Sequence, residues 1–443
     1  MIFFQLLFLL LVVYGSILVA GLSSNNMATR KSMVRIPQQI WRQAADQHQR
    51  RIRELLQPGL TPWEHQLNTG KLRNCPNPDR DDYTALDPKH PVYNFLIEYY
   101  GLKGSKGPKR LARWSPSPGL LLQENTEISS IEEFEEASYA YGYAREQPLQ
   151  PGVGRGVLLE GANQDDFASI LPLRGATILD GQGVMYNPSQ FFGKDDLSLR
   201  EEKVKQATPY LWYRSILTST LQAEPILHCH GLHEWAMQYH PEGSPPPPSG
   251  VYQSHMPLRV TREVINEAVE RRGVSCTHVD ALRFFAPAAG PLNHHGSSLE
   301  RADQLRLEQP ACVHAHMDLL KIALKLRPFC DAVLIQRILE IALESRRLDV
   351  AASPYEATDY GVEVIPIETK EGREEYRVQQ KELMAKAEPI RRDLLRAYET
   401  VLTLGFDESI VKRADQSPQP ERFAKAEPGG LPWRQNLITS PSE

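Results

Sequence analysis

The chain has 443 residues, of which 41% are hydrophobic and 24% charged, and its formal net charge is −5 at pH 7. This composition is that of a globular protein and excludes a collagen-like or wholly disordered chain, and the length is enough for one large domain or two ordinary ones. The acidic balance excludes a global positive field that would draw the protein onto nucleic acid, so a nucleic-acid partner would have to bind a local basic patch.

The N-terminal segment is strongly apolar. Residues 1–22 contain no charged side chain and are long enough to cross a bilayer or to form the apolar part of a signal peptide. We therefore expect residues 1–26 to be a targeting or anchor segment, with the membrane or the translocon as its partner.

A second start is available at Met27, after which the chain is basic and free of acidic residues as far as Ala45, a composition typical of transit peptides. The sequence thus predicts a membrane-targeted or organellar protein (plastid or mitochondrion) through residues 1–45. It predicts a soluble cytoplasmic or nuclear protein if translation starts at Met27.

The rest of the chain divides by composition into helical segments and loops. Apolar residues at helical spacing predict a basic helical arm in residues 27–57, which Pro58 and Gly59 end. We expect a main helical domain over residues 89–407. The regions around it are a linker at 58–88, a surface insertion at 115–155, a Pro-rich loop at 241–250 and a disordered tail at 408–443.

Within the main domain, apolar periodicity predicts helices, and short apolar runs separated by Gly and Asp predict strands. The expected fold class is mainly α, one large helical domain with a few short strands in residues 156–186. The expected helices are residues 90–100, 201–221, 260–271, 314–326, 331–347 and 371–404.

Cysteine and histidine cluster in one window of the chain. Ten of the thirteen histidines and three of the five cysteines lie between residues 228 and 316. They form three pairs, Cys229 with His233, Cys276 with His278, and Cys312 with His314. An odd number of cysteines, too few for a disulfide framework, favours a reducing compartment and a metal-binding or catalytic use for the clustered ones.

Four ligands drawn from these six residues would satisfy a tetrahedral zinc site, because zinc takes thiolate and neutral imidazole. Neither C-x-x-C nor H-E-x-x-H occurs, and free cysteines are often buried for packing alone. A carboxylate also lies close to each pair: Glu234, Asp280 and Asp318.

A metal-free site is the alternative. Asp280, Asp318 or Glu308 would activate water, and a histidine such as His278, or Arg283, would stabilise developing charge. A structural ion pair between Asp280 and Arg283 competes with this interpretation. For His228, His230 and His240, a solvent-facing turn rich in histidine is the competing interpretation.

A glycine-rich motif, LQPGVGRG at residues 149–156, is similar to the phosphate-binding hairpin of helix-hairpin-helix DNA-binding proteins. Its flanks do not form the two helices that such a motif needs, and an ordinary loop is the favoured interpretation.

Eight segments in this order resemble one protein family. They are HPVYNFLIEYY, LARWSPSPG, VLLEGA, GLHEWAMQY, CTHVDALRFF, LEQPACVHAHMDL, ASPYEAT and IETKEGREEY, and they cover roughly residues 88–400. The family is widespread in actinobacteria, and its members carry the label 3-methyladenine DNA glycosylase. The residues that match its pattern are the three Cys/His pairs, Glu234, Trp235, Asp280, Arg283, Phe284, Phe285, Glu308 and Asp318. His316 stands where the pattern has Asn, and residues 115–155 are an insertion relative to shorter members.

The resemblance implies hydrolysis of the N-glycosidic bond of an alkylated purine, after the base has been flipped out of the duplex. DNA or another nucleobase-containing compound would then be the partner; the sequence indicates no protein partner. Trp235, Tyr239, Phe284 and Phe285 would stack on the base, and Asp280 or Asp318 would act as general base.

Two alternatives stay open beside the glycosylase. In a metal-dependent hydrolase, zinc held by the Cys/His pairs would activate water, and Glu234 or Asp280 would carry the proton. In a non-enzymatic protein, the same metal would stabilise the fold.

Overall fold

The computed structural model describes residues 34–61, 84–116, 156–194, 196, 198–244, 255–297 and 299–416. The expected leader at residues 1–26, nearly all of the PGVG motif, and most of the predicted linker, insertion, Pro-rich loop and tail lie outside these residues. Among the described residues, no helix has the length and apolarity that a membrane span requires.

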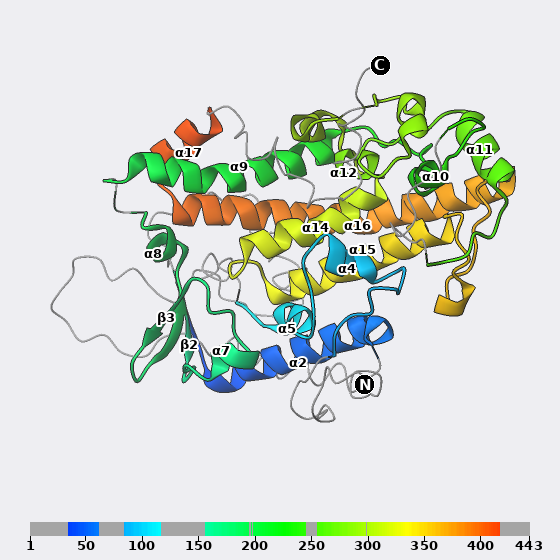
Figure 1. The fold of residues 1–443 in the computed structure, drawn as a ribbon. Coiled ribbons are helices and arrows are strands. Elements are labelled where there is room, and N and C mark those ends of the chain that lie inside the picture. The colour runs from blue at the N-terminus through cyan, green and yellow to red at the C-terminus, as the bar shows by residue number, and fades with distance from the viewer. Residues whose placement is uncertain are drawn as a thin grey trace, which may run out of the picture.

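The architecture is mainly α, as the sequence predicts, with long helices lying side by side and a small sheet at one end (Figure 1). The long helices are α9 (Arg200–Gln222), α14 (Val313–Leu326), α15 (Ala332–Ala351) and α16 (Lys370–Gly405). Helix α14 packs against both α15 and α16, and α9 packs against α16. Apolar residues on the facing stripes of these helices build the core, because burying such stripes is what stabilises a helix bundle.

The sheet has four strands in the order β1-β2-β4-β3. Its strands are β1 (Val34–Ile36), β2 (Val157–Glu160), β3 (Ala176–Leu179) and β4 (Gly183–Tyr186). Strand β1 pairs with β2 in parallel, whereas β2 and β3 each pair with β4 antiparallel. Three of the strands fall in the segment where the sequence predicts them, whereas β1 directly precedes helix α2 (Gln38–Leu56).

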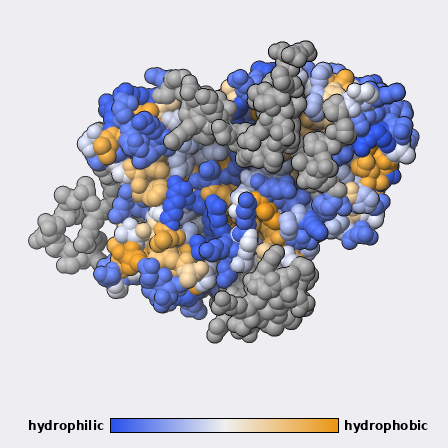
Figure 2. All heavy atoms as spheres, in the orientation of Figure 1, coloured by the Kyte–Doolittle hydropathy of each residue, from blue (hydrophilic) through white to orange (hydrophobic). Residues whose placement is uncertain are grey.

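Shorter helices connect these elements and cover the bundle. They are α4 (Asn94–Glu98), α5 (Lys106–Ala112), α7 (Asp166–Ser169), α8 (Pro188–Phe192), α10 (Leu232–Gln238), α11 (Arg262–Glu270), α12 (Val279–Leu282), α13 (Gln304–Leu307) and α17 (Glu408–Asp415). Four 3-10 segments complete the set: η1 (Gln57–Gly59), η4 (Pro287–Leu292), η5 (Arg301–Asp303) and η6 (Thr358–Tyr360). On the face seen in Figure 2, apolar patches are interspersed with polar side chains.

Two sequence predictions need correction. The predicted helix at residues 90–100 is shortened to α4, because hydrogen-bonded turns at His90 and Tyr93 precede it. The predicted disordered tail begins instead with helix α17, whose Ile410 is fully buried and which packs against α9. The side chain of Asp407 caps α17 by accepting a hydrogen bond from the Ser409 amide.

The predicted basic arm is helix α2 (Gln38–Leu56), and its apolar face belongs to the common core. Trp41, Ile52 and Leu56 are fully buried, and the indole N–H of Trp41 donates a hydrogen bond of 2.9 Å to the Glu160 carbonyl of β2. The helix thereby connects the sheet to α5 and α15, against which it also packs.

His48 of α2 predicts a dependence of stability on pH. The ring is buried and neutral: Nε2–H donates to the Leu111 carbonyl at 2.9 Å, and Nδ1 accepts from the Gln336 amide at 2.8 Å. Burial lowers the pKa of His48 to about 4, whereas the unfolded chain has an ordinary histidine pKa near 6.5. The unfolded state therefore binds the extra proton first, and stability is lost as the pH falls from about 6.5 toward 4.

Acidification from pH 7 to pH 5 is thus expected to cost about 2 kcal/mol through His48 alone. The measurement is urea unfolding at both pH values for wild type and His48→Gln. We expect the variant to be less stable at pH 7 but to lose about 2 kcal/mol less on acidification. An equal loss in both proteins would contradict the role given to His48.

Candidate metal centre

The first element of the site is the turn that leads into α10. His230 and Gly231 both have positive φ, 49° and 70°, and the turn reverses the chain just before His233. A Cβ on Gly231 would lie only 3.1 Å from the Ala352 Cβ, so a larger residue would be both strained and crowded. The turn places Cys229 Sγ 3.8 Å from His233 Nδ1, so the two members of the first predicted pair are in contact.

A first group of ligands forms where α10, α14 and α15 meet. One ligand atom each of His233, His314 and Asp349 lies within 4.8 Å of the others. His233 Nε2 and Asp349 Oδ1 are 2.6 Å apart, and the His233 and His314 ring centroids are 4.4 Å apart. His233 and Asp349 are buried, whereas His314 is partly exposed, so the group has one side toward solvent.

Arg346 orients the carboxylate of Asp349 from behind. Its Nη1 binds Asp349 Oδ2 one helical turn along α15 and Glu234 Oε1 at 2.7 Å, while Nε donates to the Pro91 carbonyl at 3.1 Å. Because one oxygen of Asp349 is held by the guanidinium, the other is directed at His233. Partners of this kind fix ligands around metal ions. Because Glu234 is ion-paired with Arg346, it is a structural partner of this arginine rather than a free general base.

A second group lies beside the first. His278 precedes α12, Glu308 follows α13, and Asp318 lies on α14 one turn after His314; a ligand atom of each lies within 4.8 Å of the others. All three side chains are buried. The His278 and His314 rings stack with centroids 4.9 Å apart, so the two groups are in contact.

Cations surround the carboxylates of the second group. Lys321 Nζ lies 3.0 Å from Asp318 Oδ2 and 3.6 Å from Asp280 Oδ2. Asp280 also pairs with Arg283 and, at 2.6 Å, with Arg301. Asp280 is therefore a centre of ion pairing, which favours the structural interpretation of its contact with Arg283 over a role as general base.

The protonation states follow from these contacts. Burial raises the pKa of Asp349, but His233 and Arg346 lower it more, and the net pKa is below the ordinary range. Burial raises the pKa of Glu308, and the nearby Asp318 raises it further, although His278 lowers it. Burial also lowers the pKa of His314, and the neighbouring His233 and His278 lower it further. His314 and Asp349 are thus in the forms that bind metal ions, a neutral imidazole and an ionised carboxylate. Burial lowers the pKa of His233, but Asp349 and Cys229 raise it more, to well above its ordinary value, so a metal ion there would have to displace a proton.

The polar atoms of the two groups face one another: His233 Nε2 lies 2.6 Å from Asp349 Oδ1, and His278 Nε2 lies 3.5 Å from Asp318 Oδ2. His278 Nδ1, which is buried, has no hydrogen-bond partner among the described residues. Unpaired buried polar atoms are costly and rare, and a bound ion is one explanation of them. The donor types, imidazole and carboxylate, also suit zinc, iron or manganese. The residues present therefore fit a metal ion.

The cysteines of the predicted pairs lie at the edge of the site but in neither group of metal ligands. Cys229, Cys276 and Cys312 are free thiols, and so is Cys330. A hydrogen bond with Cys276, and then the nearby His233, hold the pKa of Cys229 well below its ordinary value in spite of burial. The carboxylates, rather than the thiols, complete both groups.

The aromatic residues expected to stack on a base lie elsewhere. Trp235, Tyr239 and Phe285 are buried: the indole of Trp235 donates to the Ala352 carbonyl at 2.7 Å, and the Tyr239 hydroxyl donates to Glu270 at 2.8 Å. Phe284 is partly exposed and packs edge-on against Tyr99 at 5.8 Å. These contacts assign Trp235 and Tyr239 to the core.

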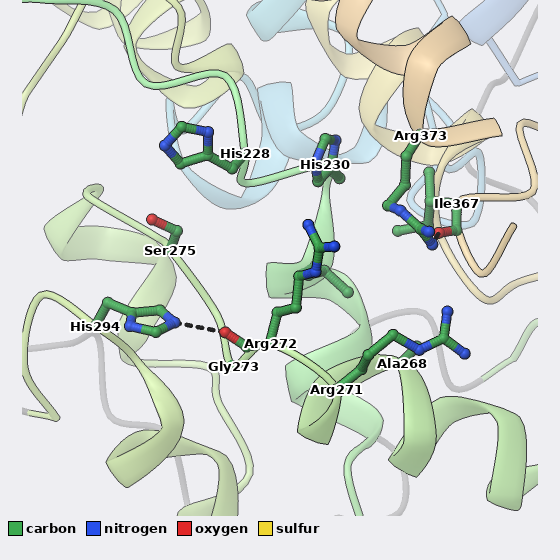
Figure 3. Close-up of a pocket in the computed structure, with 11 residues that line it drawn as sticks. His228, His230, Ala268, Arg271, Arg272, Gly273, Ser275, His294, Ile367 and Arg373 are labelled. Atoms are coloured by element: carbon green, nitrogen blue, oxygen red, sulfur yellow. Dashed lines mark hydrogen bonds between the residues drawn. The ribbon is translucent and has the colours of Figure 1, made fainter. Parts of the chain in front are cut away.

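A cavity of about 310 Å³ is lined in part by residues that directly neighbour site residues along the chain. Figure 3 shows His228, His230 and Arg272 around it, with Arg373 approaching from another segment. Several residues that line the cavity are sequence neighbours of predicted site residues. His228 and His230 flank Cys229, Leu232 precedes His233, and Ser275 precedes Cys276. For His228, His230 and His240 the sequence allowed either a ligand role or a solvent-facing turn. His228 and His230 line this cavity, whereas the His240 ring binds the Ser244 carbonyl at 2.8 Å.

The structure brings together His233, His278, Glu308, His314 and Asp318, which the sequence predicted, and adds Asp349 and Arg346, which it missed. A signal for both existed. Ile335, Ile338 and Ala342 form the buried stripe of α15, and Asp349 continues that stripe at helical spacing, where a charged residue needs a partner.

Comparison with family models, curated proteins and solved structures finds no match. Fold and site together define a mainly helical protein with buried His, Asp and Glu groups that could hold a metal ion.

Proposed function

We propose that this protein is a metal-dependent hydrolase whose ligands are His233, His314 and Asp349 in one position and His278, Glu308 and Asp318 in a second. The observation that carries the proposal is the contact between two three-ligand groups, whose His278 and His314 rings stack at 4.9 Å. Zinc is the first metal to test, with iron and manganese as the other ions that suit these donors.

The number of ligands supports a catalytic rather than a purely structural metal. Structural zinc sites are closed by four protein ligands, usually cysteine and histidine, whereas catalytic sites have three and leave a position open. Each group here has three, and His314 has a partly exposed side. A bound divalent ion would act as a Lewis acid and lower the pKa of water, and paired ions stabilise both attacking and leaving oxygens.

The residues of the chain have separate tasks in this proposal. Arg346 orients Asp349, and Lys321 balances the charge of Asp318. Glu308 accepts a hydrogen bond at Oε2 from Gln304, which orients this carboxylate toward the second position. The glycosylase expectation has less support, because Trp235, Tyr239 and Phe285 are buried in packing and not open to a flipped base.

The test is metal analysis joined to a hydrolysis assay. The full chain is purified and its metal content is measured. Hydrolysis of p-nitrophenyl acetate, p-nitrophenyl phosphate and bis(p-nitrophenyl) phosphate is then assayed before and after chelation. We expect bound metal, loss of hydrolysis on chelation, and recovery when zinc, manganese or iron is returned.

His314→Gln is expected to lose most of the metal and the activity, because the ring belongs to one group and stacks on the other. The matched control is His240→Gln, whose ring binds only the Ser244 carbonyl among the described residues. Metal-free wild type that takes up none of the three ions would overturn the proposal. Bound metal without hydrolysis, with unfolding on chelation, would support the metal-stabilised alternative instead.

A further inference from the structure

The cavity is open to solvent and lined by basic side chains, of which Arg271 and Arg272 are exposed. Arg271 and Arg272 come from the end of α11, and Arg373 comes from the first turn of α16 (Figure 3). Three histidines, His228, His230 and His294, add further nitrogen atoms. The lining residues, all of them described, include no aspartate or glutamate.

One guanidinium of the three binds no carboxylate or carbonyl of any residue that the structure describes. Arg271 pairs with Glu267 at 2.5 Å, and Arg373 donates to the Ile367 carbonyl at 2.8 Å. Arg272 makes no side-chain hydrogen bond or ion pair with any residue that the structure describes. Its backbone is nevertheless fixed, because His294 Nε2–H donates to the Arg272 carbonyl at 2.5 Å (Figure 3).

The turn that presents Arg272 requires glycine at the next position. Gly273 has φ +69°, and a Cβ there would lie 2.6 Å from the Leu292 carbonyl oxygen. Only glycine adopts this conformation without strain. A constrained backbone thus fixes the position from which the exposed side chain of Arg272 lines the cavity.

The cations gathered around the cavity repel one another. Burial lowers the pKa of Arg373, and the nearby Arg271 and Arg272 lower it further. A bound anion would remove this repulsion, and its oxygens would accept hydrogen bonds from the guanidinium groups. Arginine is suited to this task because its planar fork binds two oxygens of one phosphate.

We propose that this cavity binds the phosphoryl group of a small phosphate ester. The volume of about 310 Å³ lies at the lower end of the range for small-molecule sites, which excludes a large ligand. Leu232, Ala268 and Ile367 form an apolar wall for the organic part of the ester. That this ester is the substrate of the neighbouring centre rests on the proposed hydrolase function; the anion site does not.

In the hydrolytic step a water oxygen forms a bond to phosphorus and the ester P–O bond breaks. The leaving alcohol takes up the proton, and inorganic phosphate is the second product. No oxidant or further reactant is needed.

The experiment uses the full chain after its metal has been removed. Inorganic pyrophosphate is the probe, and its binding is measured by titration calorimetry. Wild type is expected to bind, and Arg272→Gln is expected to weaken binding by about 10-fold or more, since it removes charge-assisted hydrogen bonds. The matched control is Arg392→Gln, an exposed arginine of α16 that pairs with Glu388. It removes the same charge outside the cavity and is expected to leave the Kd unchanged.

Arg272 has no partner to lose among the described residues, so Arg272→Gln is expected to fold normally, and circular dichroism checks this. Absence of pyrophosphate binding, or equal weakening in both variants, would overturn the anion site. Binding that depends on Arg272, in a protein that hydrolyses nothing with any metal, would support the anion site and overturn only the proposed function. A nucleoside monophosphate and a sugar phosphate, titrated next, identify the preferred organic part.

Discussion

Replacement of Arg346 by methionine is expected to lower the free energy of unfolding by about 3–5 kcal/mol, the range for breaking a buried ion pair by removing one partner. The guanidinium is buried and binds Glu234 at 2.7 Å, Asp349 and the Pro91 carbonyl. Without it, two buried carboxylates lose their shared cation. Methionine keeps most of the volume, so the effect is one of charge rather than of a cavity.

Urea denaturation with chelator present measures this prediction free of any contribution from bound metal. The control is Arg337→Met on the same helix, which removes an ion pair with Asp393 of 2.6 Å whose arginine side chain is 40% exposed. Pairs of that kind contribute about 0–1 kcal/mol. Adding Glu234→Gln to the Arg346 variant should recover part of the loss, because one unpaired charge is removed. A loss no greater than that of Arg337→Met would show that the buried network is not stabilised by Arg346.

Replacement of His278 by glutamine is expected to reduce hydrolysis by about 100-fold or more, since the loss of even an outer partner of a ligand costs 10- to 100-fold. His278 is the only imidazole among the ligands proposed for the second position, and its Nε2 lies 3.5 Å from Asp318 Oδ2 of the same group. The metal content should fall from two ions per chain to one, because the first group keeps its three ligands.

Asp280→Asn is the control that distinguishes a proposed metal ligand from a carboxylate that only lies beside the ligands. Asp280 lies in contact with Lys321, Arg283 and Arg301 but is in neither ligand group. We expect this variant to keep both ions and to lose stability. If His278→Gln retained two ions, or Asp280→Asn lost one, the assignment of the second position would be wrong.

The helices could be predicted because their apolar periodicity is a local property of the chain. Helices α9, α11, α14, α15 and α16 begin and end within a few residues of the predicted limits. The segment at residues 90–100 was predicted less well, since its apolar composition is that of a buried segment of any kind and the turns at its start depend on backbone hydrogen bonds. Helix α17 was missed because its polar sequence is stabilised by packing of Ile410 against the bundle, which composition does not reveal.

For the candidate site, the sequence by itself determined the residue types and the window in which they lie. His233, His278, His314 and Asp318 were recognised from their clustering, and Glu308 was named as a candidate base. Only the tertiary structure decided their partners. Clustering along the chain cannot specify which donors converge, since convergence depends on how α10, α14 and α15 cross. That crossing supplied Asp349 from a distant helix, left the cysteines at the edge of the site, and placed Arg272 and Arg373, far apart in sequence, around one cavity.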